Sequence, residues 1–306
     1  MHSLRNLALL LLLIACSPAS ADDAHNSPAQ LDIGLALGSG GAGGLAHIAM
    51  LQVFDELQIR PARISGSSIG AVIGVLYAAG LDGNEIHDIF AEFGGSNLDA
   101  LSRLMRPGAD LGLSDLLRLD LGNGGLLDSS GFIDFLKTKV EARHFADLTI
   151  PLEVVATDFW SGEMVVLKDG PLFPAIAASM AVPVLFSPVA VGEDLLVDGG
   201  TSNPLPFDLL TGRHARVVAI DVTGSRTPGE SGEAEITDML FNTFKIMQQS
   251  IIKARMLGHP PDLYLKPDTG NVLMLSFHRV EQTMDDAQPA AEQLREQLRS
   301  WRDERE

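Results

Sequence analysis

A serine flanked by glycines stands at residues 66–70, where the sequence reads Gly-Ser-Ser-Ile-Gly. In the G-x-S-x-G pattern the serine lies on a sharp turn between a strand and a helix, and a side chain at either glycine would collide with neighbouring backbone. The flanks agree with that context, because residues 60–64 are compatible with a short strand and the apolar run 69–79 stops at Gly80, as a helix would. The pattern predicts Ser68 as a nucleophile.

An aspartate at the end of another predicted strand is a candidate base for that serine. Leu195–Val197 is typical of a buried strand, and it leads into Asp198 and two glycines, Gly199 and Gly200. The Asn-Pro-Leu-Pro at residues 203–206 cannot continue as a central strand, so the chain turns there. On the residues alone, Asp198 either stabilises this turn or faces the serine.

A glycine-rich loop lies between a predicted strand and a predicted helix. Leu31–Leu37 alternates between large and small residues, which indicates a strand, and the sequence Gly-Ser-Gly-Gly-Ala-Gly-Gly follows at residues 38–44. Apolar residues at helical spacing then run from Met50 to Leu57. This succession of strand, glycine loop and helix predicts an α/β fold.

The loop has two chemical interpretations. Gly38, Gly40 and Gly43 match the dinucleotide fingerprint G-x-G-x-x-G, but that fingerprint also requires an acidic residue at the end of the next strand, which here ends at residues 64–66 as Ile-Ser-Gly. The alternative is an oxyanion hole, in which unpaired amides bind the negative oxygen formed when a serine attacks an ester. We favour the oxyanion hole, because consecutive parallel strands bring the loop and Ser68 to one edge of the sheet.

Taken together, these segments resemble the bacterial patatin-like phospholipases. The match runs from Leu31 to about Pro206 in the family's order, through residues 38–47, 66–71, 155–158, 178–183 and 197–200. The resemblance implies an α/β fold of three layers, α/β/α, around a mostly parallel central sheet. It also implies a catalytic dyad without histidine, in which Ser68 is the nucleophile and Asp198 the general base.

The resemblance further implies that the backbone amides of Gly40 and Gly41 form the oxyanion hole. The glycines that would support the site are Gly38, Gly43, Gly44, Gly66, Gly70, Gly199 and Gly200. Members of the family usually carry Arg or Lys where this sequence has Gly43. A hole made of backbone amides does not need that side chain, but its absence removes a cation that would organise the loop or meet a headgroup.

An aspartate with an ordinary pKa is a weak base at neutral pH, so the dyad needs a perturbed one. Burial among the apolar residues next to Asp198 would raise its pKa. A Ser-His-Asp triad is the alternative, and the histidines available to it are His144, His214 and His278. We favour the dyad, since a lone histidine is more often structural, and we expect His47 in the first helix to be packed.

The N-terminus resembles an export signal. Arg5 precedes an apolar run at residues 7–15, which has the length of a signal-peptide core and is too short to span a bilayer. The Leu-Ile-Ala-Cys that ends at Cys16 resembles a bacterial lipobox, in which the cysteine is acylated and becomes the new N-terminus. Cleavage after Ala21 is the alternative and would release a soluble protein. We expect a periplasmic or envelope protein, anchored to the membrane through Cys16.

The rest of the sequence suggests a single catalytic unit behind a tether. We assign residues 1–21 to the signal peptide, 22–30 to the tether, and 31–210 to the patatin-like domain. Residues 211–306 are expected to complete the fold and to end in a charged helix. The intervening residues 81–149 form either a lid over the site or helices that complete the core.

Charge and motifs exclude other classes of function. The net charge is −18 and no cluster of Lys and Arg is present, which argues against nucleic-acid binding. Neither H-E-x-x-H nor an EF-hand loop occurs, so we expect no metal, and no cofactor is expected either. We predict a lipid acyl hydrolase that cleaves phospholipid or lysophospholipid through an acyl-Ser68 intermediate. A general carboxylesterase or thioesterase, and a non-catalytic lipid-binding envelope lipoprotein, remain as alternatives.

Overall fold

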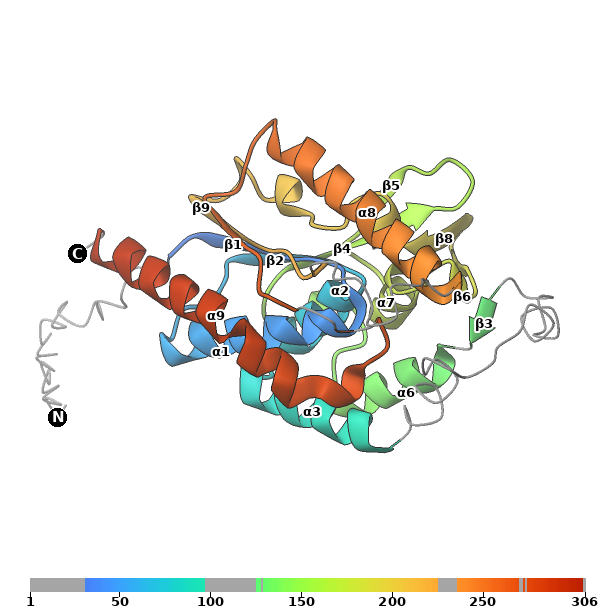
Figure 1. Ribbon diagram of the computed structural model, residues 1–306, viewed down its shortest axis with the longest axis horizontal. Coiled ribbons are helices and arrows are strands. Elements are labelled where there is room, and N and C mark those ends of the chain that lie inside the picture. The colour runs from blue at the N-terminus through green and yellow to red at the C-terminus, as the bar shows by residue number, and fades with distance from the viewer. Residues whose placement is uncertain are drawn as a thin grey trace, which may run out of the picture. The chain divides into compact units, whose positions relative to one another are not determined.

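The computed structural model describes residues 31–96, 125–127, 129–224, 236–269, 272 and 274–304. Its centre is an eight-stranded sheet in the order β10-β9-β1-β2-β4-β8-β7, with β5 also paired to β4 (Figure 1). These strands are β1 (Ile33–Leu37), β2 (Arg63–Ser67), β4 (Leu152–Asp158), β5 (Met164–Leu167), β7 (Val189–Val191), β8 (Asp194–Asp198), β9 (Arg216–Ile220) and β10 (Leu263–Leu265). A separate pair consists of β3 (Gly125–Leu127) and β6 (Val184–Phe186).

The sheet is parallel from β10 to β4 and antiparallel at β5, β8 and β7. Parallel strands in α/β proteins are covered on both faces, so they are apolar throughout rather than alternating with polar residues. Strand β1 has this character, because all five of its residues are buried. The mostly parallel sheet predicted from the sequence is confirmed.

Helices cover the two faces of this sheet, which makes the three predicted layers (Figure 1). The helices α1, α3 and α9 lie on one side and α8 lies on the other. The α-helices of the described residues are α1 (Ala46–Glu56), α2 (Ile69–Ala78), α3 (Gly83–Ser96), α6 (Ser130–Lys139), α7 (Leu172–Ser179), α8 (Ile236–Met256) and α9 (Val280–Asp303). Short 3-10 helices are η1 (Gly41–Leu45), η3 (Phe145–Asp147), η4 (Gly199–Thr201), η5 (Phe207–Leu209) and η6 (Phe277–Arg279).

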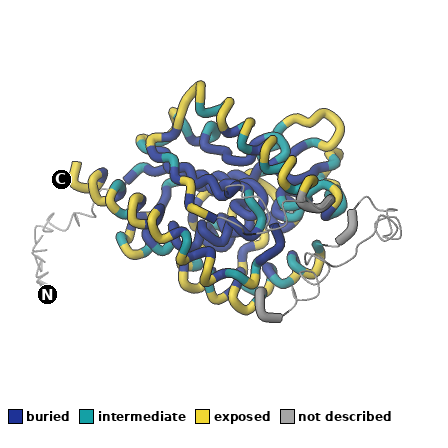
Figure 2. The backbone as a smooth tube through the Cα atoms, in the orientation of Figure 1, coloured by how far each residue is buried: buried dark blue, intermediate teal, exposed yellow. Residues whose placement is uncertain are grey.

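The hydrophobic core is divided by the sheet. Along β1, Leu35 and Leu37 belong to the larger cluster with α1, α2 and α9, whereas Ala36 between them belongs to a smaller cluster with Ile252 of α8. Successive side chains of a strand point to opposite faces, so this division follows directly from the backbone. The buried backbone lies in the centre of the molecule, and the exposed turns of the helices lie outside it (Figure 2).

The predicted elements are present, with local differences at their ends. The strand expected at residues 60–64 is β2, which begins at Arg63 and continues to Ser67, so it delivers the chain directly to Ser68. Gly80 follows α2 with φ of 109°, as expected of a glycine that ends a helix. Ser129 stands at the N-cap of α6, and its side chain makes no capping hydrogen bond.

Two sequence predictions fall wholly or partly outside the described residues. The signal peptide, Cys16 and the tether lie there entirely, as do residues 97–124 of the possible lid. In the described part of that region, Phe93 stacks on Phe135 of α6, and α6 buries Ile133 and Leu136. These contacts favour a packed, structural role for α6. No helix within the described ranges is long and apolar enough to cross a membrane.

The C-terminal third contributes to the same compact unit as the rest of the described chain, which runs from Leu31 onward. Strand β9 pairs with β1 in the middle of the sheet, and β10 follows at its edge. The terminal helix α9, the charged helix expected from the sequence, packs against α1 and buries Leu294, Leu298 and Trp301.

Candidate active site

Ser68 occupies a strained turn between β2 and α2. It is the N-cap of α2, with φ of 54° and ψ of −123°, a conformation that a non-glycine residue adopts only when its surroundings impose it. The flanking glycines are required by space, since a Cβ on Gly70 would lie 2.1 Å from the Leu37 carbonyl oxygen and one on Gly66 would lie 2.7 Å from Ala71 Cα. The turn predicted from the pentapeptide is therefore present, and it presents the Ser68 hydroxyl at the carboxyl edge of the sheet.

A second serine, which the sequence did not mark as functional, holds this turn in place. The Ser68 amide donates a hydrogen bond of 2.9 Å to Ser179 Oγ, and the Ser179 hydroxyl donates one of 2.6 Å to the Val155 carbonyl oxygen. Ser179 is completely buried at the end of α7. It thereby connects the strained turn to β4, the strand between Ser68 and Asp198.

Asp198 reaches the serine because β8 runs antiparallel to β4. Ser67 pairs with Val155, and Ala156, the next residue of β4, pairs with Asp198. The last residue of β8 therefore lies level with the end of β2, and β4 is the one strand between them. The glycine that follows fits closely, since a Cβ on Gly199 would lie 2.1 Å from the Val155 carbonyl oxygen.

The carboxylate of Asp198 is fully buried and only partly hydrogen-bonded. Its Oδ1 accepts a bond of 2.7 Å from the Gly200 amide, whereas Oδ2 has no hydrogen-bond partner of ordinary length among the described residues. Burial raises the pKa of Asp198 to about 7, and the nearby Ser68 hydroxyl and Gly200 amide offset part of that rise. The Ser68 hydroxyl thus interacts with the carboxylate without closing a full hydrogen bond, which is common in active sites without substrate.

Backbone hydrogen bonds hold the glycine loop after β1 on both sides of two amides that have no acceptor among the described residues. Apart from bonds within η1, the amides of this loop donate three backbone hydrogen bonds: Gly38 to Ile220, Ser39 to Pro204 and Ala42 to Met274, at 3.1, 2.8 and 2.8 Å. Between these, the amides of Gly40 and Gly41 have no acceptor in the described part of the chain. Rigid, unpaired donors of this kind are what an oxyanion hole requires.

Glycines are needed in the loop because it passes very close to other backbone. A Cβ on Gly40 would lie 2.1 Å from the Val222 carbonyl oxygen, and Gly41 has φ of 58° with the Met274 carbonyl oxygen 2.5 Å from its Cβ position. A Cβ on Gly44 would overlap the side chain of Ile69, the residue after Ser68. The loop therefore packs directly on the serine turn.

The histidines of the described residues do not complete a triad. His47 is fully buried, its Nε2 lies 2.9 Å from the Gly38 carbonyl oxygen, and burial lowers its pKa to about 4, so it is a neutral residue that supports the glycine loop. His144 lies beside Asp147, and His214 bonds to Asp32, before the amino end of β1. His278 is exposed in η6. Within the described ranges, no hydrogen bond joins a histidine to Ser68 or Asp198.

Helix α8 supplies a further contact to the site that sequence patterns did not reveal. Gln248 is buried, and its Nε2 donates a hydrogen bond of 2.8 Å to Ser39 Oγ in the glycine loop. The same nitrogen lies 2.3 Å from the position that a Cβ on Gly200 would occupy. Gln248 therefore hydrogen-bonds to the glycine loop and lies against the turn that carries Asp198.

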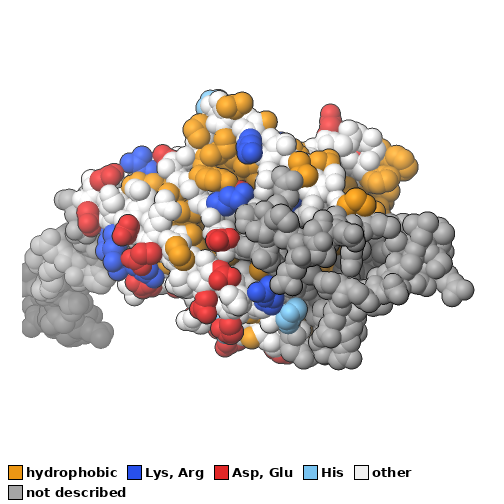
Figure 3. All heavy atoms as spheres, in the orientation of Figure 1, with side chains coloured by type: hydrophobic (Ala, Val, Ile, Leu, Met, Phe, Trp, Pro, Cys, Tyr) orange, Lys and Arg blue, Asp and Glu red, His pale blue; other side chains and the backbone are white. Residues whose placement is uncertain are grey.

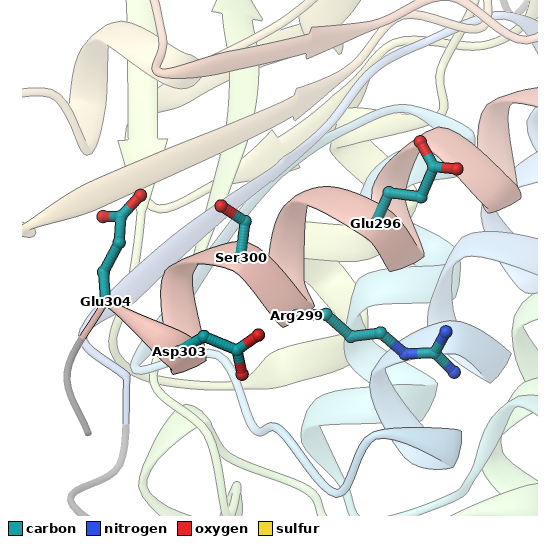
Figure 4. A pocket seen from close by; sticks show the side chains of 5 residues that line it. All are labelled: Glu296, Arg299, Ser300, Asp303 and Glu304. Atoms are coloured by element: carbon teal, nitrogen blue, oxygen red, sulfur yellow. The ribbon is translucent and has the colours of Figure 1, made fainter.

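A shallow depression elsewhere on the surface is not part of this site. It lies on the outer face of α9, lined by Glu296, Arg299, Ser300, Asp303 and Glu304, whose side chains do not converge on a common point (Figure 4). Glu304 pairs with Arg216 at the start of β9, which places the depression near the amino edge of the sheet. Among the described residues, no group of three or more His, Cys, Asp or Glu is arranged to hold a metal ion.

Comparison with known proteins identifies the family of this chain. The family described as patatin-like phospholipase matches residues 35–211. The chain belongs to the patatin-like phospholipase family. An uncharacterized NTE family protein of Mycobacterium tuberculosis is 33% identical to this patatin-like chain over 207 residues, which are 67% of the chain and 53% of the relative. Human patatin-like phospholipase domain-containing protein 6 is 31% identical over 193 residues, 62% of this chain and 13% of that protein.

Among solved structures, VipD from Legionella pneumophila is similar with a TM-score of 0.49 and 17% sequence identity, covering 88% of this chain and 67% of VipD. This patatin-like chain spans about half the length of the mycobacterial relative.

We predict that Gln248→Leu lowers kcat for ester hydrolysis about tenfold while changing KM little, because the glycine loop loses its link to the Asp198 turn. The loss of one buried hydrogen bond should also lower the free energy of unfolding by about 1–2 kcal/mol. Steady-state kinetics and urea denaturation measure the two effects. The matched control is Ser250→Ala, since Ser250 is exposed and bonds to Ile246 of its own helix. A destabilised Gln248→Leu variant with unchanged kcat would contradict the positioning role.

Proposed function

We propose that this protein is a lipid acyl hydrolase that cleaves acyl esters of phospholipid or lysophospholipid through an acyl-Ser68 intermediate. The observation that carries the proposal is the pairing of a strained serine turn with a fully buried aspartate whose second carboxylate oxygen is unbonded among the described residues. The strain holds the Ser68 hydroxyl where substrate can reach it, and the carboxylate is poised to accept its proton.

In the first half of the reaction, Ser68 Oγ attacks the ester carbonyl carbon and its proton passes to Asp198 Oδ2. The carbonyl oxygen becomes negative, and the amides of Gly40 and Gly41 donate hydrogen bonds to it. Collapse of this tetrahedral intermediate breaks the bond to the alcohol, which leaves with the proton from Asp198. The products of this half are the free alcohol and an acyl ester on Ser68.

In the second half, water replaces the alcohol. The oxygen of the water attacks the acyl carbon while Asp198 takes a proton from the water. The oxyanion hole again binds the negative oxygen that forms on the acyl group. Release of Ser68 Oγ, which regains the proton, yields a carboxylic acid. A pKa of about 7 for Asp198 suits both steps, because the group is then a stronger base than an ordinary aspartate and about half of it is ionised at neutral pH.

Exposed apolar side chains support a lipid substrate. Four large apolar residues in the part of α8 whose burial is described are exposed, namely Met239, Leu240, Ile246 and Met247. Helix α8 is also the helix that contacts the glycine loop through Gln248. Phe159 and Trp160, the latter 79% exposed, follow β4 at the same edge of the sheet. Figure 3 shows hydrophobic side chains along the region where Figure 1 places α8 and β5. Apolar groups exposed in this way are typical of surfaces that meet lipid.

The proposal is tested by acyl release from a phospholipid in mixed micelles and from a short p-nitrophenyl ester, together with labelling by a fluorophosphonate. We expect hydrolysis of both esters and a single label, found on the peptide that contains Ser68. Faster turnover of the short soluble ester than of the lipid would favour a general carboxylesterase. A folded protein that releases no acyl group and takes no label would indicate a lipid-binding protein without catalytic activity.

We also propose that the protein is exported and anchored in the cell envelope through an acylated Cys16, on the basis of the lipobox-like sequence before it. In a bacterial host, the full-length protein should incorporate labelled palmitate and remain in the membrane fraction. Cys16→Ser should remove the label, whereas Ser17→Ala should leave it unchanged. An unlabelled protein whose N-terminus is Asp22 would establish cleavage after Ala21 in its place.

A further inference from the structure

Helix α8 places a lysine beside the glycine loop. Lys245 lies three residues before Gln248, so the two side chains project from neighbouring positions on the inward face of the helix. Lys245 is half-buried, and in the described part of the chain it makes no hydrogen bond and no ion pair.

The surroundings of this ammonium connect it to the oxyanion loop. Lys245 Nζ lies 3.9 Å from the position that a Cβ on Gly224 would take, and Thr269 Oγ1 lies 3.0 Å from that same position. The Thr269 hydroxyl also lies 3.2 Å from the Cβ position of Gly43 in the glycine loop. The ammonium, the buried hydroxyl and the loop are thus adjacent just beyond the carboxyl end of β9.

An ammonium removed from water without a counter-ion is unfavourable, and burial lowers the pKa of Lys245. The charge of a partly buried lysine is usually compensated by a carboxylate, as in Lys266, whose ammonium lies 3.1 Å from the buried carboxylate of Asp221. Lys245 has no such carboxylate among the described residues. The favourable way to compensate its charge is a bound anion, and the Thr269 hydroxyl next to it adds a hydrogen-bond donor.

We propose that Lys245 and Thr269 form a subsite for the phosphate group of the substrate, next to the oxyanion hole of Gly40 and Gly41. This inference rests on the proposed function, because in a glycerophospholipid the phosphate lies only a few bonds from the ester that Ser68 attacks. A lysine suits a phosphate as a compact point charge. The subsite selects lipids that carry a phosphate over neutral glycerides.

The test compares phosphatidylcholine with a diacylglycerol of the same acyl chains, both in neutral detergent micelles. For Lys245→Met we expect kcat/KM to fall about tenfold or more for phosphatidylcholine, with a clearly smaller fall for diacylglycerol, as for the loss of one charged hydrogen bond. Thr269→Val should lower the ratio of kcat/KM for phosphatidylcholine to kcat/KM for diacylglycerol, as Lys245→Met does. Lys245→Arg should keep that ratio close to its value in the unaltered protein. Lys253→Met is the matched control, because Lys253 is an exposed lysine of the same helix. Equal losses on both lipids, or none, would overturn the subsite.

A direct probe separates this inference from the proposed function. Glycerol 3-phosphate should inhibit p-nitrophenyl ester hydrolysis competitively, with an inhibition constant about tenfold higher for Lys245→Met than for the unaltered protein. If the unaltered protein hydrolyses no ester, the proposed function fails, and broadening of the glycerol 3-phosphate ³¹P signal then decides the subsite. The subsite is supported if the signal broadens with the Lys253→Met variant but not with Lys245→Met. It is refuted if the two variants give the same signal.

Discussion

Ser68→Ala is expected to lower kcat by roughly 10⁴-fold or more on both a phospholipid and a short p-nitrophenyl ester, because the variant has no oxygen with which to form the acyl intermediate. Alanine meets the same backbone constraint as serine at φ of 54°, so the turn and the fold should persist. Acyl release measures the loss, and circular dichroism confirms that the variant is folded.

The neighbouring Ser67 provides a matched control. It is also a buried serine of the same pentapeptide, and its hydroxyl has no hydrogen-bond partner among the described residues. Ser67→Ala should therefore keep kcat within a few-fold, as expected where no catalytic contact is lost. If Ser68→Ala retained full activity, the nucleophile assignment would be wrong and the lipid-binding alternative would gain support.

Asp198→Asn is expected to lower kcat about 10³–10⁴-fold, because an amide cannot accept the Ser68 proton. In the unaltered protein, the pKa of Asp198 is raised to about 7 by burial. Activity on an uncharged ester should therefore fall about tenfold for each pH unit below 7 and reach a plateau above it, because the base must be ionised. The residual activity of the Asp198→Asn variant should not show this fall below pH 7.

The same substitution should stabilise the fold at high pH. The pKa of Asp198 is about 7 in the folded protein against an ordinary value of 3.8, so between these pH values the folded state retains a proton that the unfolded state has released. Stability from this group is therefore lost as pH rises from about 4 to 7, by about 4 kcal/mol at most. The asparagine side chain does not titrate, so Tm of Asp198→Asn should exceed that of the unaltered protein at pH 8 and approach it at pH 4.

Thermal denaturation across this pH range, with kinetics on the same samples, checks both effects. The matched control is Asp208→Asn, an aspartate of the same region that is about a third exposed and pairs with Arg255. That variant should lack the gain in Tm at pH 8. An Asp198→Asn protein that stayed active with an unchanged pH profile would show that another group is the base.

Local patterns were sufficient for the parts of the site that are local. Glycines on both sides of Ser68 predicted the strained turn, because only residues without Cβ fit within 2.1–2.7 Å of adjacent backbone. The glycine run before α1 predicted a loop at a helix start, and the structure adds that its amides are fixed on either side of Gly40 and Gly41. Apolar runs and helix ends predicted the α/β layers for the same reason, since periodicity reflects nearby backbone geometry.

The tertiary structure decided what depends on residues far apart in the chain. The sequence places Asp198 at a strand end, but its approach to Ser68 depends on β8 pairing antiparallel with β4, and its raised pKa depends on complete burial. No local pattern distinguishes Ser179, Gln248 or Lys245 from other polar residues of helices. Their roles arise when α7 and α8 pack onto the sheet, because hydrogen bonds and desolvation are set by the neighbours that folding brings within a few ångströms.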